Sequence, residues 1–341
     1  MREGSTYADP VGEILSAMGI ALVTDAVPEP PSAPLHVRPR ASGPGPNRVE
    51  TPSPRRYAPD VTEHASLGAS SLRALAERHG ISPRRSLGQH FLVDPNLARA
   101  IAADAGAGLG TRVVEIGAGL GSLTRALAET GADVVAIELD RALLPALEES
   151  VGGLEHVRVV RADAMAFDWL DVLDGGSWVL AGNLPYNVAT PLVLETLGRA
   201  PAIRRLVVMV QREVGERLAA GPGEEGYGAP SVRVAYRAEA TIVRRVPTAV
   251  FWPRPNVDSV VVALDRRERP PVGVDERALW RVVDAGFAER RKTMRNAVRR
   301  ITGGGVEEAD RILAGAKIEP SARAETLSLE ELARLAEALP V

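Results

Sequence analysis

Short runs of Val, Ile and Leu that alternate with helical segments constrain the fold of this chain more than any other feature. Between residues 111 and 211 such runs occupy 111–116, 132–139, 156–163, 177–183 and 204–210. Near-continuous apolar runs are typical of strands buried on both faces of a parallel sheet. Because segments with helical periodicity separate them, the pattern predicts an α/β fold with helices packed on a parallel sheet. Two later runs, 240–246 and 259–267, predict antiparallel strands at one edge.

Composition divides the chain into three parts. Residues 24–60 are rich in Pro, Ser and Gly, so this segment cannot bury enough apolar surface to offset its ordering entropy. We therefore expect 1–68 to be an extension outside the folded core, either a tail with its own role or the product of a start codon assigned too far upstream. The sheet domain would span 69–267, and the helical periodicity after it predicts a small all-helical domain over 268–341.

Bulk composition narrows the classes of function. The 341 residues include no cysteine and carry a formal net charge of −3. The first fact excludes disulfides and thiolate metal sites, and the second requires a local basic patch for any nucleic-acid partner. No apolar run approaches the roughly 20 residues that span a bilayer, and the apolar stretch 14–23 follows acidic residues where a signal peptide would be basic. We expect a cytoplasmic protein with no metal and no membrane association.

Capping residues mark several helix starts. Asp94 and Pro95 predict an N-cap and a first helical position. Asp140 is placed to cap the helix that follows the second strand. Thr190 and Pro191 have the pattern of an ordinary helix start.

The first strand ends in a glycine-rich turn, VVEIGAGLGSLT, which leads into a helix. Its glycines, Gly117, Gly119 and Gly121, allow a tight turn and let a ligand approach the backbone at a helix N-terminus. Glu138 ends the next strand, the position at which an acid binds ribose hydroxyls in nucleotide-binding folds. The order of strand, turn, helix, strand and acid predicts a nucleotide-type cofactor.

The spacing of the glycines narrows the class of cofactor. A dinucleotide fingerprint reads G-x-G-x-x-G, whereas this turn reads G-x-G-x-G and follows Glu115, which suits a smaller adenosyl ligand and disfavours a nicotinamide dehydrogenase. The turn resembles the first motif of S-adenosylmethionine-dependent methyltransferases. In such an enzyme Asp163, at the end of the third strand, would accept a hydrogen bond from the adenine amine of the cofactor. The alternative is a surface Asp that caps a turn.

The fourth strand ends in AGNLPYNVATPL, on the same side of the sheet as the glycine turn. Ligands of open α/β sheets bind there, outside the carboxyl ends of the strands; the plain alternative is a turn. An amine attached to an aromatic ring, such as that of a nucleobase, is a poor nucleophile. The side-chain carbonyl of Asn183 and the backbone carbonyl of Leu184 can each accept one of its N–H groups, which turns its lone pair toward a methyl donor. Pro185 fixes the backbone and removes a competing donor.

NLPY resembles the catalytic motif of methyltransferases that act on exocyclic amines. Tyr186 offers a ring on which an extruded base can stack, and such bases are commonly sandwiched between aromatic side chains. Phe251, in VFWPRP, would supply the ring on the other face. The alternative for Phe251 is core packing beside Trp252.

The resemblance extends over the whole predicted core, from about residue 71 to the C-terminus. The segments that carry it are SLGQHFL, VEIGAGLGSLT, AIELD, DAMAFD, GNLPYNVATPL, MVQREVGERL, VFWPRPNVDSVVV, FAERRKTMRNAV and RAETLSLEELARL. Together they resemble the small-subunit rRNA adenine N6,N6-dimethyltransferases. The resemblance implies a Rossmann-like class I S-adenosylmethionine-dependent fold. It also implies transfer of two methyl groups to each of two adjacent adenosines, in the 3′-terminal hairpin of small-subunit (16S) rRNA within a 30S precursor.

The resemblance also implies roles for individual residues in a monomeric enzyme. His90, Leu92, Gly117 and Asn183 would contact S-adenosylmethionine together with Glu138 and Asp163. Two departures are visible, because the family usually has Asn at the position of His90 and Pro at that of Ala118. The first departure changes how the methionine end of the cofactor would be held.

A basic segment, ERRKTMRNAVRR at 289–300, lies in the predicted helical domain. Its basic side chains are Arg290, Arg291, Lys292, Arg295, Arg299 and Arg300. If the segment is one helix, Arg291, Arg295 and Arg299 share a face. A charge run of this kind is often only a solvated surface, whereas the resemblance implies that it binds rRNA phosphates.

Two rival functions stay open. The first is the related large-subunit rRNA adenine methyltransferase of the macrolide-resistance type; the C-terminal segments RRKTMRNAV and RAETLSLEELARL favour the small-subunit type. The second is a mainly non-catalytic ribosome assembly factor on the same fold, against which the intact NLPY and Glu138 argue.

Overall fold

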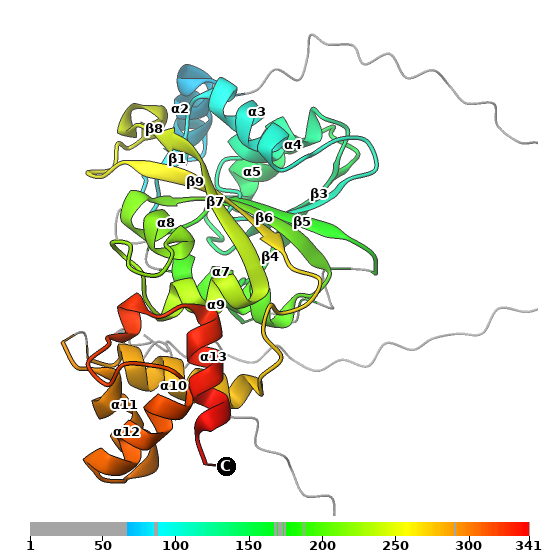
Figure 1. Cartoon of the computed structure of the whole chain (residues 1–341). Coiled ribbons are helices and arrows are strands. Elements are labelled where there is room, and N and C mark those ends of the chain that lie inside the picture. The colour runs from blue at the N-terminus through cyan, green and yellow to red at the C-terminus, as the bar shows by residue number, and fades with distance from the viewer. Residues whose placement is uncertain are drawn as a thin grey trace, which may run out of the picture. The chain divides into compact units, whose positions relative to one another are not determined.

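A seven-stranded sheet forms the centre of the computed structural model of this chain (Figure 1). The structure describes residues 67–84, 88–166, 169, 173, 175–186, 188–289 and 291–340, and Ser66–Val341 form one unit. Nearly all of the predicted extension therefore lies outside the described residues, as do Arg290 and Asn187. The boundary that we predict between 267 and 268 stays a prediction.

The sheet confirms the strands expected from the apolar runs. Its order is β4-β3-β2-β5-β6-β9-β7. The first five in this order are parallel, whereas β9 is antiparallel to both β6 and β7, as predicted for the edge. The strands are β2 (Arg112–Ile116), β3 (Asp133–Glu138), β4 (Val157–Arg161), β5 (Trp178–Asn183), β6 (Ile203–Gln211), β7 (Ala238–Val246) and β9 (Ser259–Arg266).

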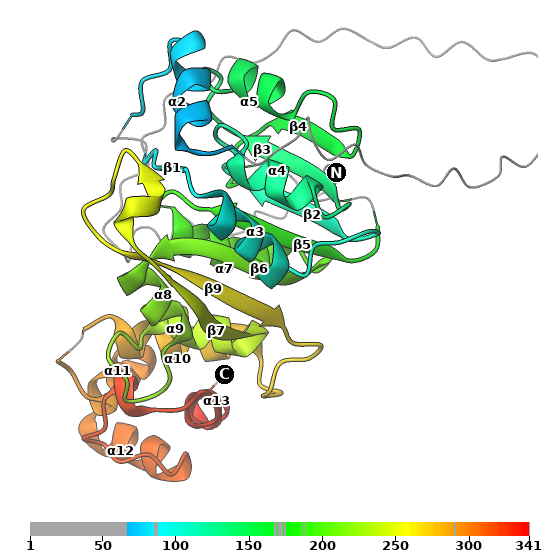
Figure 2. The same ribbon diagram turned by 90° about the horizontal axis from the view of Figure 1, so that it is seen from above.

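Helices cover both faces of the sheet (Figures 1 and 2). Because side chains alternate along a strand, Val113 and Val134 pack toward one set of helices while Val114 and Val135 pack toward the other. The first set is α3 (Pro95–Asp104), α4 (Ser122–Ala128) and α5 (Leu144–Val151). The second is α7 (Ala189–Arg199), α8 (Arg212–Ala219) and α9 (Ala229–Arg237). Burial on both faces explains the continuous apolar runs.

A small two-stranded ribbon joins two distant segments of the chain. β1 (Phe91–Leu92) follows α2 (Ala69–Arg78) and pairs antiparallel with β8 (Phe251–Trp252), which comes after the short helix η2 (Thr248–Val250). Phe91 lies opposite Trp252, and Leu92 opposite Phe251. The motifs QHFL and VFWP are therefore neighbours in space.

The C-terminal part is helical, as predicted. It consists of α10 (Glu276–Phe287), α11 (Met294–Thr302), α12 (Val306–Gly315), the short helix η3 (Ala324–Thr326) and α13 (Leu329–Ala338). Its apolar cluster also includes Val232 and Tyr236 of α9. The helical region thus packs directly on a helix that covers the sheet.

The expectation of one helix across the basic segment is wrong. α10 ends at Phe287 and α11 begins at Met294, so Arg291 and Lys292 lie in the connection between them. Met294 is fully buried in the helical cluster, and its backbone N–H donates to the carbonyl of Ala322 at 2.8 Å. Burial of this side chain against Gly286 requires a change of chain direction that a continuous helix does not allow.

Candidate active site

The glycine turn between β2 and α4 brings backbone close to three other segments. Gly117, Gly119 and Gly121 have φ angles of 76°, 58° and 86°, which favour glycine. A Cβ on Gly121 would stand 2.5 Å from the Ser150 hydroxyl, and one on Gly119 would stand 3.2 Å from the ring of Phe91. A Cβ on Gly117 would stand 3.5 Å from the backbone carbonyl oxygen of Asn183. The turn predicted for a cofactor therefore abuts the NLPY motif.

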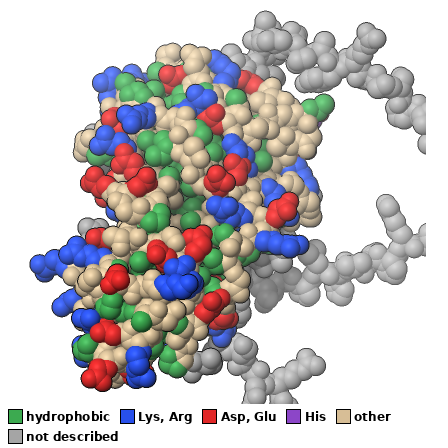
Figure 3. Space-filling view, in the orientation of Figure 1, with side chains coloured by type: hydrophobic (Ala, Val, Ile, Leu, Met, Phe, Trp, Pro, Cys, Tyr) green, Lys and Arg blue, Asp and Glu red, His purple; other side chains and the backbone are tan. Residues whose placement is uncertain are grey.

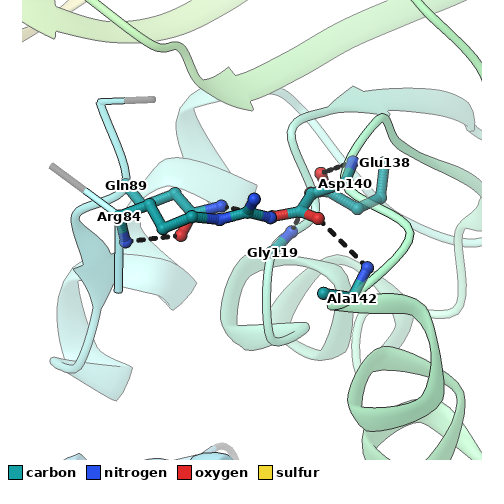
Figure 4. Close-up of polar contacts among 6 residues, drawn as sticks. All are labelled: Arg84, Gln89, Gly119, Glu138, Asp140 and Ala142. Atoms are coloured by element: carbon teal, nitrogen blue, oxygen red, sulfur yellow. Dashed lines mark hydrogen bonds and ion pairs between the residues drawn. The ribbon is translucent and has the colours of Figure 1, made fainter. Parts of the chain in front are cut away.

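Glu138 holds a buried carboxylate beside this turn (Figure 4). The residue is 7% exposed, and its oxygens accept hydrogen bonds from the backbone N–H groups of Gly119 and Asp140, both at 2.8 Å. Burial raises the pKa of Glu138, and these N–H groups oppose that shift. Each carboxylate oxygen has a further lone pair, so the group can also accept from the two hydroxyls of a ribose.

Glu115 is a second buried acid, at the start of the same turn. It is 1% exposed and accepts a hydrogen bond of 2.6 Å from the Thr124 hydroxyl. Burial raises the pKa of Glu115 to about 8, against the opposing hydrogen bond from Thr124. The side chain is therefore neutral at pH 7, unlike an exposed glutamate.

Asn183 ends β5 and is held in place by the N-terminal segment. Its side-chain nitrogen Nδ2 donates to the backbone carbonyl of His90 at 2.8 Å, which fixes the orientation of the amide and leaves its oxygen as the acceptor. Leu184 is buried, and its backbone N–H donates to Met209 of β6 at 3.0 Å. The motif therefore continues from the sheet edge with a fixed backbone.

Tyr186 is half-buried between two contacts. Its ring stacks on that of His90 with centroids 5.6 Å apart and planes 24° apart, and its hydroxyl lies 3.2 Å from the Ser259 hydroxyl. His90 Nδ1 lies 2.7 Å from the carbonyl oxygen of Pro253. A carbonyl can only accept, so Nδ1 carries a proton. The residue at which the sequence departs from the family pattern is thus packed against the tyrosine of the motif.

Phe251 presents no open face in this structure, so its predicted stacking on a bound base stays a prediction. Phe251 is 3% exposed and belongs to the cluster under α3, opposite Leu92 in the small ribbon. Core packing, the alternative interpretation, describes it. The side chain of Leu92 lies in the same cluster, so a cofactor contact at this position would involve its backbone.

Asp163 lies two residues beyond β4, at the sheet edge that also carries Glu138. The side chain is exposed and Oδ1 accepts from the backbone N–H of Met165 at 2.9 Å. This is the turn-capping contact of the alternative interpretation. It engages only one carboxylate oxygen and does not test the predicted contact with adenine.

The basic segment divides into paired and exposed side chains. Arg295 Nε and Nη2 donate to the two carboxylate oxygens of Asp310 at 2.6 and 3.1 Å, and Arg300 pairs with Glu289. Arg291, Lys292 and Arg299 are exposed. Lys and Arg side chains gather at the edge of the helical region over the α10–α11 connection (Figure 3).

Asp140 has a different role from the predicted helix cap. α5 begins at Leu144, and Asp140 instead accepts from the backbone N–H of Ala142 and from the side chains of Arg84 and Gln89. Arg84 and Gln89 are 56 and 51 positions away from Asp140 in sequence. The sequence shows Asp140 two residues after Glu138, but it does not show that Asp140 binds Arg84 and Gln89.

Two other classes of site are absent from the part of the chain that the structure describes. No group of His, Asp and Glu side chains there is arranged to hold a metal ion. Among the same residues, no helix has the length and apolarity needed to cross a membrane.

Similarity to known proteins agrees with this geometry. A family model described as ribosomal RNA adenine dimethylase matches residues 80–339. The "Ribosomal RNA small subunit methyltransferase A" of Cutibacterium acnes is 44% identical over 290 residues, which covers 82% of this chain and 96% of that protein. The protein of the same name from Moorella thermoacetica is 45% identical over 278 residues, with 78% and 96% covered.

Solved structures show the same fold. The 23S rRNA methyltransferase ErmE is 26% identical with a TM-score of 0.58, covering 73% of this chain and 99% of that one. A dimethyladenosine transferase from Plasmodium falciparum is 22% identical with a TM-score of 0.61, covering 72% and 96%. The fold prediction, a class I methyltransferase sheet with a helical C-terminal region, is confirmed. With the family model matched over most of its length, this chain belongs to the ribosomal RNA adenine dimethylase family.

Proposed function

We propose that this protein transfers methyl groups from S-adenosylmethionine to N6 of two adjacent adenosines in the 3′-terminal hairpin of small-subunit (16S) rRNA, within a 30S precursor. One observation carries the proposal: Asn183–Tyr186 leave the sheet against the Gly117 turn, and the same turn binds the Glu138 carboxylate through the N–H of Gly119. Relatives at 44% and 45% identity, whose names specify the small subunit, support the choice of rRNA. We further propose that the enzyme acts as a cytoplasmic monomer.

The residues around the glycine turn fit an adenosyl cofactor. The three glycines of the turn carry no side chain, those of Ala118 and Leu120 are buried, and Glu138 is a buried carboxylate fixed by two backbone N–H groups. Glu138 would accept from the ribose hydroxyls and Asp163 from the adenine amine. His90, Leu92, Gly117 and Asn183 would contact the remainder. When bound, S-adenosylmethionine supplies a methyl group on a positively charged sulfur.

The chain itself would position and polarise the target amine. The oxygen of the Asn183 side chain and the carbonyl of Leu184 would each accept one N–H of adenine N6, which localises the lone pair on nitrogen and turns it toward the methyl group. Asn183 suits this role because it is neutral and its Nδ2 is anchored on His90. Tyr186 would stack on the adenine. With Phe251 buried, we do not assign it a face of the base.

The helical region would bind rRNA phosphates. Arg291, Lys292 and Arg299 are exposed, and Arg290 belongs to the same segment. Arg295 is engaged by Asp310, so we expect it to contribute less. The negative net charge of the chain means that binding depends on this local patch.

The experiment is transfer of tritiated methyl groups to ribosomal particles from a strain that lacks the modification. We expect incorporation into 30S precursors at two adjacent adenosines, and a strongly reduced rate of incorporation with Asn183→Ala. Incorporation into 50S particles instead would support the large-subunit alternative. A wild-type protein that binds the particle without methylating it would support the assembly-factor alternative, and full activity of Asn183→Ala would refute the mechanism.

A further inference from the structure

Asp140 is a junction of hydrogen bonds just after Glu138 (Figure 4). Its Oδ1 accepts from the backbone N–H of Ala142 at 3.0 Å. Its Oδ2 accepts from Gln89 Nε2 at 2.7 Å and from a guanidinium nitrogen of Arg84. The Asp140 side chain is 13% exposed and that of Arg84 is 51% exposed, so the contact with Gln89 is partly buried while the ion pair with Arg84 reaches the surface.

The partners of Asp140 are themselves held together. The backbone N–H of Arg84 donates to Gln89 Oε1 at 2.9 Å, and the N–H of Gln89 donates to the carbonyl of Arg84 at 3.3 Å. The amide oxygen of Gln89 is thereby used locally, which leaves its Nε2 to face Asp140. The side-chain amide of Gln89 therefore presents its N–H group to residue 140, which must supply the acceptor.

Both ends of this arrangement lead into the active site. On one side, the backbone N–H of Asp140 donates to Glu138 Oε1 at 2.8 Å. On the other side, Gln89 precedes His90, whose carbonyl accepts from Asn183 Nδ2 and whose ring stacks on Tyr186. Asp140 therefore connects Glu138, the acid proposed to bind the cofactor, with the Gln89–His90 segment, which orients the side-chain amide of Asn183.

The charge of Asp140 is stabilised in place. Burial alone would raise its pKa, but the hydrogen bonds from Arg84, Ala142 and Gln89 outweigh burial and hold the pKa below its ordinary value. The negative charge of Asp140 contributes to the raised pKa of Glu138. Pairing with Arg84 limits that repulsion and favours an ionised Glu138.

We propose that Asp140 is a positioning residue of this methyltransferase, which sets Glu138 through its backbone and aligns the Gln89–Leu92 segment with Asn183 through its side chain. This inference rests on the proposed roles of Glu138 and Asn183. Asp140 does not touch the reacting atoms. Its loss misplaces two groups that must contact the same cofactor, and misplacement by about 1 Å can cost about 100-fold in rate.

A second carboxylate, that of Glu149, also links the N-terminal segment to the region after β3 and supplies a matched control. Glu149 of α5 accepts from Arg78 Nη2 at 2.5 Å and from His79 Nε2 at 2.6 Å. It joins α2 to α5 as an exposed carboxylate, and its hydrogen bonds with Arg78 and His79 involve neither Glu138 nor the Gln89–Leu92 segment. Glu149→Gln therefore tests whether loosening the N-terminal segment is by itself enough to impair the site.

The experiment compares Asp140→Asn, Glu149→Gln and a reversed pair, Asp140→Asn with Gln89→Glu. In the reversed pair the new amide at 140 donates to the new carboxylate at 89, which also keeps a charge opposite Arg84. The readouts are the Kd for S-adenosylmethionine by calorimetry, kcat and KM on 30S precursors, and the Tm.

We expect Asp140→Asn to weaken S-adenosylmethionine binding about tenfold and to lower kcat, with KM for the particle and the Tm nearly unchanged. Glu149→Gln should stay within about twofold of wild type, and the reversed pair should recover most of the lost affinity.

Three outcomes would each overturn the proposal: wild-type affinity in Asp140→Asn, an equal loss of affinity in Glu149→Gln, or no recovery of affinity in a folded reversed pair. If Asp140→Asn does not fold, Gln89→Ala is measured against the same expectations. A wild type that binds no S-adenosylmethionine would instead refute the proposed function.

Discussion

The end of β5 and the connection between α10 and α11 were both predicted from sequence as functional. The strand end lies where it was expected, whereas the single helix expected across the basic segment is interrupted. Asn183 lies where the topology of a parallel sheet places the end of an inner strand, next to the Gly117 turn. Arg291 and Lys292 were expected on a helical face that does not exist. A motif at a strand end depends only on the strand being present. A shared helical face depends on an unbroken helix, which tertiary packing can interrupt.

The largest expected effect tests the strand end. Asn183→Ala removes one acceptor for adenine N6 and the hydrogen bond to the carbonyl of His90. We expect kcat to fall about 100- to 1,000-fold, the range seen when one preorganised group of an active site is deleted. Single-turnover methyl transfer with saturating particles measures this. A fall in Tm that accounts for the lost activity, or a loss below tenfold, would contradict the catalytic assignment of Asn183.

The second prediction concerns the buried acid at the end of β2. The pKa of Glu115 is about 8 in the folded protein, against an ordinary value of 4.5. Below pH 4.5 Glu115 holds its proton in both the folded and the unfolded chain, so the free energy of unfolding has its highest value with respect to this group. Between about pH 4.5 and 8 only the folded chain holds it, and the free energy of unfolding falls as pH rises.

Glu115→Gln removes this dependence while keeping an acceptor for the Thr124 hydroxyl. We expect the variant to gain stability relative to wild type between pH 5 and 8 by on the order of 2 to 4 kcal/mol. Urea unfolding without cofactor at several pH values measures the difference. Parallel curves for the two proteins would show that Glu115 is ionised in the folded state.

The sequence allowed much of the sheet and part of the site to be predicted. β2 to β6, the antiparallel edge and the N-cap at Asp94 were predictable because each depends on local pattern or capping chemistry. The placement of Glu138 and Asn183 at the carboxyl ends of β3 and β5, on either side of β2, followed from strand order in this fold class. These features require no knowledge of which side chains meet across the chain.

What the sequence did not reveal depends on contacts between distant segments. Phe251 is buried where β8 pairs with β1, with Phe251 opposite Leu92 in the register. Aromatic composition alone could not distinguish a stacking ring from a core ring. α11 begins late because Met294 packs in the helical cluster. Asp140 is not the N-cap of α5 because that helix begins at Leu144, and its contacts with Arg84 and Gln89 come from a distant segment.

The third prediction tests the other region of the comparison. Replacing Arg291 and Lys292 by Glu should weaken binding to 30S precursors about tenfold and flatten its salt dependence, because both side chains are exposed. Arg295→Gln is the matched control, since Arg295 is paired with Asp310. It should cost about 1 kcal/mol of stability or less with a smaller effect on affinity. Equal losses of affinity in the Arg291/Lys292 variant and in Arg295→Gln would show that Arg295 binds rRNA as strongly as the exposed residues, contrary to this prediction.

The smallest expected effect returns to the strand end and separates the ring of Tyr186 from its hydroxyl. The hydroxyl lies 3.2 Å from the Ser259 hydroxyl, which is long for a bond between two hydroxyls, whereas the ring is held by stacking on His90. Tyr186→Phe keeps the ring, so kcat should stay within about threefold of wild type, the cost of one neutral hydrogen bond. Tyr186→Leu removes the stacking surface and should be clearly worse in the same assay. Equal losses in the two variants would mean that the hydroxyl, not the ring, positions the base, and the stacking role would then have no support.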